Sequence, residues 1–535
     1  MKTKLFSFLV FTLAIAFYIH TLSPSLAWGD GTRLQSEAIS GESIILAEMT
    51  PKAFTPDPFV FSKVGVTAWD HPLYIVLGHL LVKALPSVDS LWLVNLISAI
   101  FGAASVVLVF QLCHRQTNSL LASGYAAFAL AVSHTFWWHS STPEVYTLFI
   151  FLLLLSYFYL DQFERSNSTA HAALAAFFLG LSASNHILAF LAFPALGSYF
   201  LFSRKLTDLK TIELEKLVWP FFGFLLGFSL YIIQFIRITR NLPLDEIAGP
   251  IVGSTFFSGL SLSPLLLAES LLKYLLFLIL QFGPLGIILG VIGMRSSRKA
   301  LSFYIVYMLF GVFYRVSDQF AFFLTSHVFF VFLMGIGLHH IFNTWDKKPR
   351  FILTSILLLT IVLTPPFYRS LPTLADNFGM DDDFLDIPKV GVGVRNGLAY
   401  YIDPYKRGDY EAYDFGTQTL HDLPPDAIVI AEWYTDTDEY FVLRHFTKVE
   451  GLRPDVTVLG WMTVPPASFD PQLVWEVIEE SLPEHPVYIA SLSERFYASS
   501  ELIEMYCILP ENNLYRLYQR GDEDLQCMGI EAITD

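Results

Sequence analysis

The stretch that decides the fold is residues 90–112, SLWLVNLISAIFGAASVVLVFQL, which contains no charged side chain. A helix of this length can cross the hydrocarbon core of a bilayer, because spanning takes roughly 20 residues. Similar apolar runs recur on both sides of it. Of the 535 residues, 54% are hydrophobic and only 15% are charged, against about 25% charged in a typical soluble domain. The chain is therefore predicted to be a polytopic α-helical membrane protein.

The apolar runs before Tyr368 predict about eleven membrane spans. The first run follows a basic start and precedes Ser25-Leu26-Ala27. It also fits a cleaved signal peptide, but its length and the many later spans favour an uncleaved helix. Residues 72–86 are too short to span comfortably and are predicted to lie in the membrane interface. The eleven predicted spans are 5–22, 90–112, 119–135, 144–162, 170–185, 187–203, 217–236, 266–293, 300–315, 320–342 and 350–368.

The polar links between these spans predict the orientation. When 72–86 is kept at the surface, every second link contains Lys or Arg, from Lys2 and Lys4 through to Lys347 and Lys348. Cytoplasmic links are enriched in these residues. The N-terminus is therefore expected in the cytoplasm. A large first loop (23–89) and the C-terminal part are expected on the extracytoplasmic side.

After Tyr368 no apolar run is long enough to span a bilayer. We therefore expect a membrane domain, 1–368, and a soluble domain, 369–535. The soluble part contains 31 acidic and 11 basic residues, a balance of −20 within a chain of net charge −16. Such an acidic surface argues against nucleic acid or anionic lipid as its partner. Strand-like runs near 427–431 and 487–490 and helical stretches at 473–481 and 493–508 predict an α/β domain. Two cysteines, Cys507 and Cys527, lie in this part, and their pairing stays open.

Polar residues gather at the extracytoplasmic ends of the spans, where ionisable groups are costly and tend to be functional. Asp30, Asp70 and Glu144 are candidates for a general base, because partial desolvation raises the pKa of a carboxylate and favours proton uptake. Each has a structural alternative. Asp30 precedes a glycine and could form a turn, Asp70 could cap a helix, and Glu144 could simply complement a helix dipole.

A second group could bind phosphate. Arg315, Arg237 and Arg240 are exceptions to the charge rule, since they fall on the extracytoplasmic side. Guanidinium groups bind phosphate through two parallel hydrogen bonds, although each arginine could also snorkel to ordinary phospholipid. His186 is a further candidate partner for the phosphate. Three more candidate site residues lie at the same membrane edge, namely His71, His139 and Asn185.

No Gly-rich phosphate loop, dinucleotide motif or Cys/His metal-binding spacing is found in the sequence. We therefore predict no metal and no bound cofactor. An enzyme working outside the cell membrane, away from nucleotides, needs an activated donor that reaches it through the lipid.

This arrangement resembles the GT-C class of glycosyltransferases, which use polyprenyl- or dolichyl-phosphate sugars. More narrowly, it is similar to the family of the animal transmembrane O-mannosyltransferase of plexin-type domains and its bacterial relatives. The sequence departs from that family after Asp30, where Gly31-Thr32-Arg33 follows instead of Ser-Gly-Glu. The residues that carry the resemblance are Gly29-Asp30, His71-Pro72-Leu73-Tyr74, Gly78-His79, 95–99, Phe136-Trp137-Trp138, Glu144-Val145-Tyr146, Gly180-Leu181-Ser182, Asn185-His186, 409–416, 423–427 and 449–456.

The resemblance implies an inverting glycosyltransferase. Its donor would be a polyprenyl-phosphate sugar, its acceptor a protein or glycan hydroxyl, and its location more naturally a bacterial cell membrane than the endoplasmic reticulum. Asp30 would be the base, and Arg315, Arg237 and His186 would receive the departing phosphate. A transporter or flippase of a lipid-linked glycan is the main alternative, but it would carry ionisable residues deep inside its spans. A membrane anchor for the acidic domain would need far fewer helices.

Overall fold

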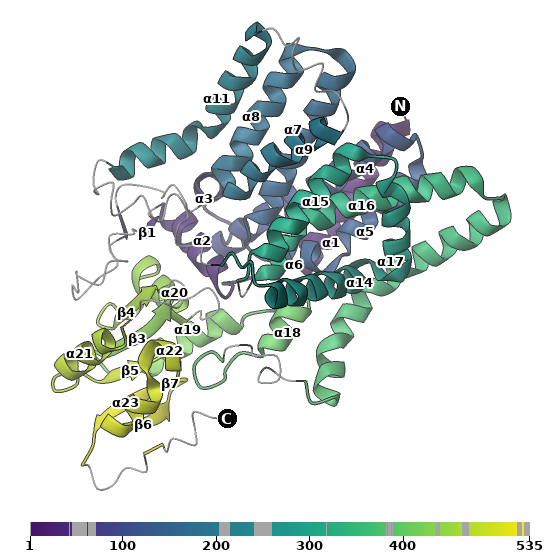
Figure 1. The fold of residues 1–535 in the computed structure, drawn as a ribbon. Helices are drawn as coiled ribbons and strands as arrows, with labels where there is room; N and C mark the ends of the chain where they lie inside the picture. The colour runs from purple at the N-terminus through teal and green to yellow at the C-terminus, as the bar shows by residue number, and fades with distance from the viewer. Residues whose placement is uncertain are drawn as a thin grey trace.

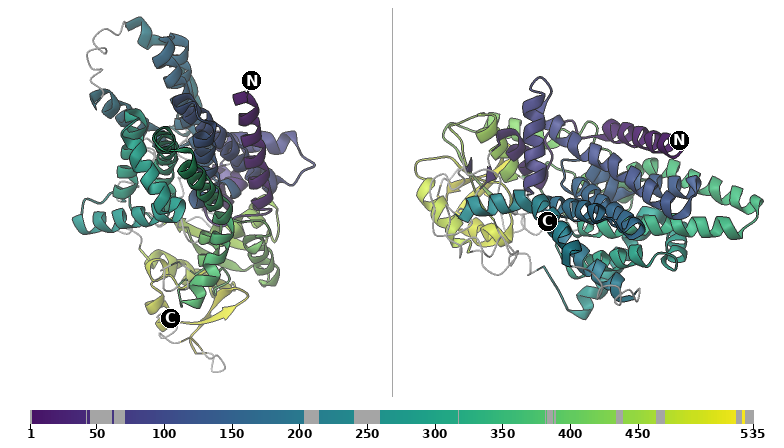
Figure 2. Two further views of the ribbon diagram at one scale, coloured as in Figure 1. Left: turned by 90° about the vertical axis from the view of Figure 1, so that its right-hand side faces the viewer. Right: turned by 90° about the horizontal axis from the view of Figure 1, so that it is seen from above.

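The structure, a computed structural model, describes residues 2–41, 43–44, 61–62, 71–202, 214–239, 259–316, 318–380, 382, 387, 389–433, 439–462, 470–521 and 527–528. A bundle of long helices occupies one end of the molecule and a small mixed sheet with short helices occupies the other (Figure 1). The two perpendicular views keep this division (Figure 2). The predicted membrane protein with a C-terminal soluble part is confirmed.

The bundle is formed by helices that follow the apolar runs. Its elements are α1 (Lys2–Thr21), α2 (Asp30–Ser40), β1 (Ser43–Ile44), β2 (Phe61–Ser62), α3 (Pro72–Ala84), α4 (Ser90–Thr117), α5 (Leu120–Ala131), α6 (His134–Ser141), α7 (Tyr146–Ser166), α8 (Thr169–Asn185), the 3₁₀ helix η2 (Ile187–Leu191), α9 (Ala192–Phe202), α11 (Leu214–Thr239), α14 (Pro264–Met294), α15 (Arg298–Phe313), α16 (Gln319–Thr344) and α17 (Lys347–Asn377).

Each of the eleven predicted spans corresponds to helical structure, and 72–86 forms the short helix α3. Seven helices in the described part of the chain are long and apolar enough to cross a membrane by themselves, or eight if the bent pair α5–α6 is one span. The other three predicted spans are the shorter helices α8, η2–α9 and α15. Helices α8 and α15 have 17 and 16 residues, slightly fewer than the roughly 20 that a straight span takes.

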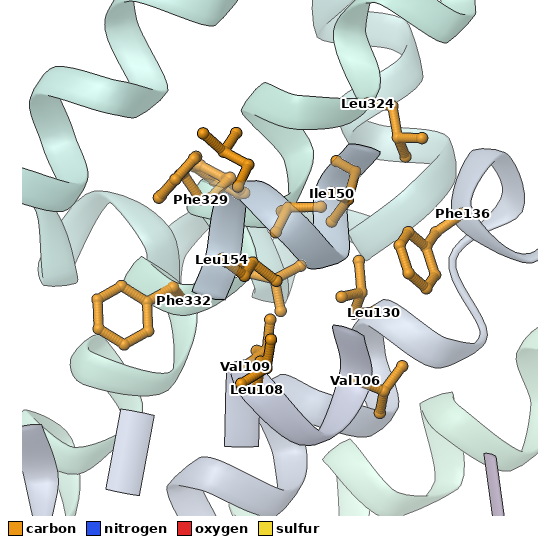
Figure 3. Packing of buried hydrophobic residues seen from close by; sticks show 14 of the residues in the cluster. Val106, Leu108, Val109, Leu130, Phe136, Ile150, Leu154, Leu324, Phe329 and Phe332 are labelled. Atoms are coloured by element: carbon orange, nitrogen blue, oxygen red, sulfur yellow. The ribbon is translucent and has the colours of Figure 1, made fainter. Parts of the chain in front are cut away.

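The core of the bundle lies between α4, α5, α7 and α16. Buried aliphatic and aromatic side chains of these helices and of α6 meet there (Figure 3). Helix α14 lies very close to α16, since a Cβ atom built on Gly293 would lie 1.9 Å from the carbonyl oxygen of Leu333. Close approach through glycine is typical of helix contacts in membranes, where dispersion and not water exclusion drives packing.

The helix pair α5–α6 bends by 61° between Ala131 and His134. Ser133 is extended there, and its hydroxyl donates to the carbonyl of Leu130. Every residue of α6 is buried. The bend therefore turns a short polar and aromatic helix inward at the membrane edge, where a straight span would have continued outward.

The C-terminal part contains a five-stranded sheet with the order β4-β3-β5-β7-β6. Strand β3 is parallel to both β4 and β5, and β7 is antiparallel to β5 and β6. The elements are α18 (Gly397–Ile402), α19 (Glu411–Asp422), β3 (Ile428–Trp433), α20 (Glu439–Arg444), the π-helix η3 (His445–Val449), β4 (Thr457–Met462), α21 (Gln472–Ser481), β5 (Val487–Ile489), α22 (Glu494–Tyr497), α23 (Ser499–Met505), β6 (Tyr506–Glu511) and β7 (Leu514–Gln519).

Two predicted strands and the helix at 473–481 are confirmed, but the predicted helix 493–508 is wrong at its end. Helix α23 stops at Met505, and the next six residues form β6. Asn512 and Asn513 both have positive φ and turn the chain back into β7, a conformation that tight hairpins favour. A disulfide joins Cys507 to Cys527. Strand pairing thus overrides the local helical pattern.

The two parts share one hydrophobic cluster. Trp28 from the first loop and Trp138 from α6 lie in it together with Tyr400 and Phe415 from the C-terminal part. Helix α17 continues to Asn377, beyond the predicted domain boundary at residue 368. The C-terminal domain is therefore docked on the loop end of the bundle.

Candidate active site

A pocket opens where the first loop, the link between α6 and α7, the start of α16 and helix α18 meet. It contains about 660 Å³ of empty space, counting its open mouth. Helices α2, α6 and α18 lie together at the end of the bundle that faces the sheet (Figure 1). The lining residues are Trp28, Gly29, Asp30, Leu34, His71, Trp138, His139, Glu144, Val145, Tyr146, Asp318, Phe320, Ala321, Tyr400 and Tyr401.

Asp30 is the first residue of α2 and lies at the pocket wall. Gly29 before it has a φ of 69°, a left-handed conformation that favours glycine. The Asp30 carboxylate lies 3.4 Å from the Nε of Arg33, and its side chain is 44% exposed. A carboxylate at a helix N-terminus is stabilised by the helix dipole. Asp30 thus presents an accessible carboxylate in the pocket.

Glu144 also lines the pocket, in the link before α7. Its backbone is held by Ser98 of α4, whose hydroxyl accepts from the Glu144 N–H at 3.0 Å and donates to the Glu144 carbonyl. Burial raises the pKa of the Glu144 carboxyl well above its usual range, and the nearby carboxylates of Asp30 and Asp318 raise it further. The Glu144 carboxyl therefore holds a proton more readily than an exposed carboxyl does, and in its protonated form it can donate a hydrogen bond.

His71 lines the pocket next to Asp30 and starts α3 in a left-handed conformation, with φ 55°. Its Nδ1 lies 2.7 Å from the carbonyl oxygen of Asn185. Burial and the charge of Arg33 lower the pKa of His71 to about 4. Since a carbonyl only accepts, Nδ1 carries the proton and Nε2 keeps its lone pair.

Asn185 and His186 support the pocket from behind and are not among its lining residues. The Asn185 side chain donates to the carbonyl of Val145 at 2.9 Å, which ties α8 to the link that carries Glu144. The Nδ1 of His186 accepts from the Leu188 N–H, and its ring lies 5.0 Å from that of His71. Burial lowers the pKa of His186 well below its usual value, so it carries no charge toward a phosphate at neutral pH.

His139 lines the pocket from α6 and is only 1% exposed. Its Nδ1 lies 4.0 Å from a carboxyl oxygen of Glu144. Four of the residues singled out from the sequence, Asp30, Glu144, His71 and His139, therefore line one pocket.

The arginines predicted to bind phosphate lie elsewhere or cannot be placed. Arg315 donates to both carboxyl oxygens of Glu269 in α14, at 3.1 and 3.2 Å, and is not among the lining residues. Arg237 belongs to α11, and nothing is described of its side chain. Arg240 and the candidate base Asp70 lie outside the described residues.

Sequence reasoning missed three contributors. Arg33 is 8% exposed, and its charge acts on both His71 and Glu144. It was visible only as a departure from a family pattern. Asp318 adds a third carboxyl to the lining, and Tyr400 with Tyr401 bring the C-terminal part into the pocket. No motif marked these last residues, because a tyrosine pair in an amphipathic stretch usually belongs to a core.

The described residues contain no group of three or more His, Cys, Asp or Glu side chains arranged to hold a metal ion. The pocket's three carboxyls come from separate segments.

Comparisons with known proteins agree with this arrangement. Residues 70–209 match the family model of the Protein O-mannosyl-transferase TMEM260 N-terminal domain. Protein O-mannosyl-transferase tmem260 of Dictyostelium discoideum is 23% identical over 515 residues, covering 84% of this chain and 56% of the relative. The chain thus spans about half the length of that curated relative.

The fold also matches solved structures. ArnT from Cupriavidus metallidurans bound to undecaprenyl phosphate superposes with a TM-score of 0.56 at 12% identity, covering 97% of this chain and 98% of that one. The apo state of ArnT gives 0.55 at 11% identity, covering 95% and 96%. The predicted resemblance is confirmed: the chain is a multi-pass membrane protein with the GT-C glycosyltransferase fold and is similar in sequence to the TMEM260 group of protein O-mannosyl-transferases.

Proposed function

We propose that this protein transfers a sugar from a polyprenyl-phosphate donor to a hydroxyl group of a protein or glycan. Mannose is the first sugar to test, because the relative is named for O-mannosyl transfer. The observation that carries the proposal is the pairing of two unlike carboxyls in one pocket. The Asp30 side chain is 44% exposed, whereas the Glu144 side chain is only 16% exposed and its pKa is raised. Two carboxyls whose environments separate their pKa values can divide acid and base roles.

In the proposed reaction, Asp30 accepts the proton of the acceptor hydroxyl as its oxygen attacks the anomeric carbon. The bond from that carbon to the donor phosphate breaks, the configuration inverts, and the lipid phosphate leaves with the bonding electrons. Glu144 in its protonated form can donate a hydrogen bond to an oxygen of the donor. Both groups line the pocket.

The leaving phosphate needs a positive partner, and Arg33 is a cation whose charge acts on His71 and Glu144. We assign it this role ahead of Arg315, whose guanidinium is occupied by Glu269. Arg237 and Arg240 stay predictions for the same lipid-phosphate group.

The pocket and the C-terminal domain are proposed to face the extracytoplasmic side. Basic residues concentrate at the other end of the bundle, where Arg115 pairs with Asp161 at 3.2 Å and Lys299 with Glu164 at 3.0 Å. Cytoplasmic helix ends are typically basic. Protease digestion of intact and opened spheroplasts tests this orientation. A C-terminal domain cut only after opening would contradict it.

The test of the function is transfer of radiolabelled mannose from polyprenyl-phosphate mannose by purified protein in nanodiscs, with cell extract as acceptor. Asp30→Asn should lower the transfer rate by about 10³-fold, because general base catalysis contributes roughly 10²–10⁴-fold. Asp89→Asn is the matched control, since Asp89 caps α4 by accepting the Trp92 N–H and asparagine caps equally well.

Equal transfer by Asp30→Asn and Asp89→Asn would remove Asp30 as the base. No transfer from any polyprenyl-phosphate sugar, combined with movement of a lipid-linked glycan across the bilayer, would favour the flippase instead.

A further inference from the structure

One buried side chain in the pocket has no role in the reaction as proposed. His139 is 1% exposed, and neither of its ring nitrogens has a hydrogen-bond partner among the described residues. Its closest carboxyl oxygen, from Glu144, is 4.0 Å from Nδ1, beyond hydrogen-bonding distance.

The other buried histidines that the structure describes all make hydrogen bonds. Buried polar groups in native proteins usually find partners, and an exception calls for an explanation. His139 differs from its neighbour His134 on the same helix, whose Nε2 bonds to backbone carbonyls of α18. The bonded set is His134 with Tyr401 and Ile402, His186 with Leu188, His327 with Gln281, and His445 with Ser36.

The His139 ring is fixed in place. It stacks on Phe320 with centroids 5.7 Å apart and planes at 13°, and the Tyr146 ring lies 4.7 Å away. The Trp138 ring meets it edge-on at 5.0 Å. A side chain held on three sides cannot turn to find another partner. His139 lines the pocket, and its two unpartnered nitrogens are buried in the pocket wall.

The chemistry of the ring limits what that molecule can be. A neutral imidazole presents one donor and one acceptor. A hydroxyl group also donates and accepts, whereas an ionised phosphate oxygen only accepts and a prenyl chain does neither. The pocket wall around His139 is aromatic, which suits the apolar faces of a sugar ring. His139 is also far more buried than Asp30, whose side chain is 44% exposed. The contact is therefore with the small group that fills the pocket and not with a macromolecular acceptor.

We propose that His139 binds a hydroxyl group of the donor sugar and so contributes to sugar selection. This inference rests on the function proposed above. The general base and the phosphate partner then come from α2, and the sugar-selecting residue comes from α6.

The key variant is His139→Phe, which keeps a flat ring against Phe320 and Tyr146 but removes both nitrogens. It should bind and transfer the parent mannose donor about 10- to 100-fold less efficiently in kcat/KM, because a hydroxyl in the site loses its partner. Its melting temperature should equal or exceed that of the wild type, since an unpaired buried polar group disappears. His134→Phe is the matched control and should melt lower, because it loses the bonds to α18.

The decisive measurement uses polyprenyl-phosphate mannose and its 2-, 3-, 4- and 6-deoxy analogues with both proteins. For one analogue, wild type and His139→Phe should have the same kcat/KM within about threefold, because the missing hydroxyl and the missing imidazole remove the same contact. If the role of His139 were purely structural, His139→Phe would lower kcat/KM by the same factor for every donor.

If the wild type transfers mannose and His139→Phe discriminates among the analogues just as the wild type does, the inference is overturned while the proposed function stands. If the wild type transfers no sugar from any donor, both fall.

Discussion

Two consecutive helices of this protein relate polarity and burial in opposite ways. Helix α1 is apolar, yet only four of its twenty residues are buried, and side chains such as Leu5 and Phe8 are about two-thirds exposed. Helix α2 has the sequence DGTRLQSEAIS, yet eight of its eleven residues are buried. Lipid is the solvent for α1, so exposure of apolar groups costs nothing there. Helix α2 lies between the bundle and the C-terminal domain.

The buried polar groups of α2 are acceptable because they are paired. Gln35 is fully buried, and its amide donates to the Asn95 side chain at 2.8 Å and to the Ser25 carbonyl. Its oxygen accepts from the Ala27 N–H at 3.1 Å. The comparison teaches that hydropathy identifies the membrane spans of this fold. The candidate site, and the contact between α2 and the C-terminal domain that supports it, are identified by polar residues that are buried.

The largest effect on stability is expected where that pairing is broken. Gln35→Ala should destabilise the protein by about 3 kcal/mol, because it leaves the Asn95 amide and the Ala27 N–H buried with fewer partners. Leu13→Ala on α1 is the contrast, since Leu13 is 48% exposed to lipid, and it should cost less than about 1 kcal/mol. Melting in detergent, followed by tryptophan fluorescence, compares the two. A larger loss for Leu13→Ala would reverse the comparison.

The same contrast explains what could be predicted from the sequence. The spans follow from hydropathy alone, because lipid imposes one simple rule on exposed residues, and Asp30 and Glu144 stood out as carboxyls at span ends. Arg33 did not stand out, since a polar helix on a loop reads as solvent-exposed. Its burial follows from the docking of the C-terminal domain, which depends on contacts hundreds of residues apart in sequence, such as that between Ser36 and His445.

Helix α9 and the C-terminal part show two further limits of predicting structure from local sequence patterns. The run 187–203 is predicted as one span, and in the structure it forms η2 followed by α9. The His186 side chain caps the start of η2. The tail helix predicted to reach residue 508 stops at Met505, because Ile508 pairs with Leu517 across the hairpin. Local patterns do not report such partners, since these form only when the whole domain assembles.

Helix α20 of the C-terminal domain carries a buried carboxyl, which gives an intermediate effect that depends on pH. Glu439 starts α20, is 1% exposed, and accepts the Gly391 N–H at 2.8 Å. Burial raises its pKa to about 7, and Glu432 adds to this while Arg395 opposes it. The unfolded chain releases this proton near pH 4.5 and the folded protein near pH 7, so the folded state loses stability as the pH rises between these values.

Glu439→Gln keeps the hydrogen-bond acceptor and removes the charge. It should stabilise the protein at pH 8 by about 1–3 kcal/mol, since one pKa unit corresponds to about 1.4 kcal/mol, and should change little at pH 5. Melting temperatures of wild type and variant at both pH values provide the measurement. An equal shift at pH 5 and pH 8 would show that the carboxyl does not titrate in this range.

The smallest expected effect on stability concerns the contact between α2 and the C-terminal domain. The Ser36 hydroxyl donates to the Thr32 carbonyl at 2.7 Å and lies 2.9 Å from the Nδ1 of His445 in η3. Since the hydroxyl proton is used by Thr32, the serine oxygen accepts from the histidine ring. Ser36→Ala should cost about 1 kcal/mol, the usual net value of one buried hydrogen bond. His445→Ala should cost more, because it also removes a ring packed at 1% exposure.

The double variant separates the bond from the packing. If α2 owes its burial to pairing with the C-terminal domain, the losses of Ser36→Ala and His445→Ala should not add, and their coupling should be about 0.5–1 kcal/mol. Hydrogen exchange should then rise together in α2 and η3, because both helices depend on one contact. Additive losses, with faster exchange confined to the helix that carries the substitution, would mean that the two helices are buried independently. In that case the contacts of α2 with the bundle, such as those of Gln35, would be enough to keep this polar helix buried.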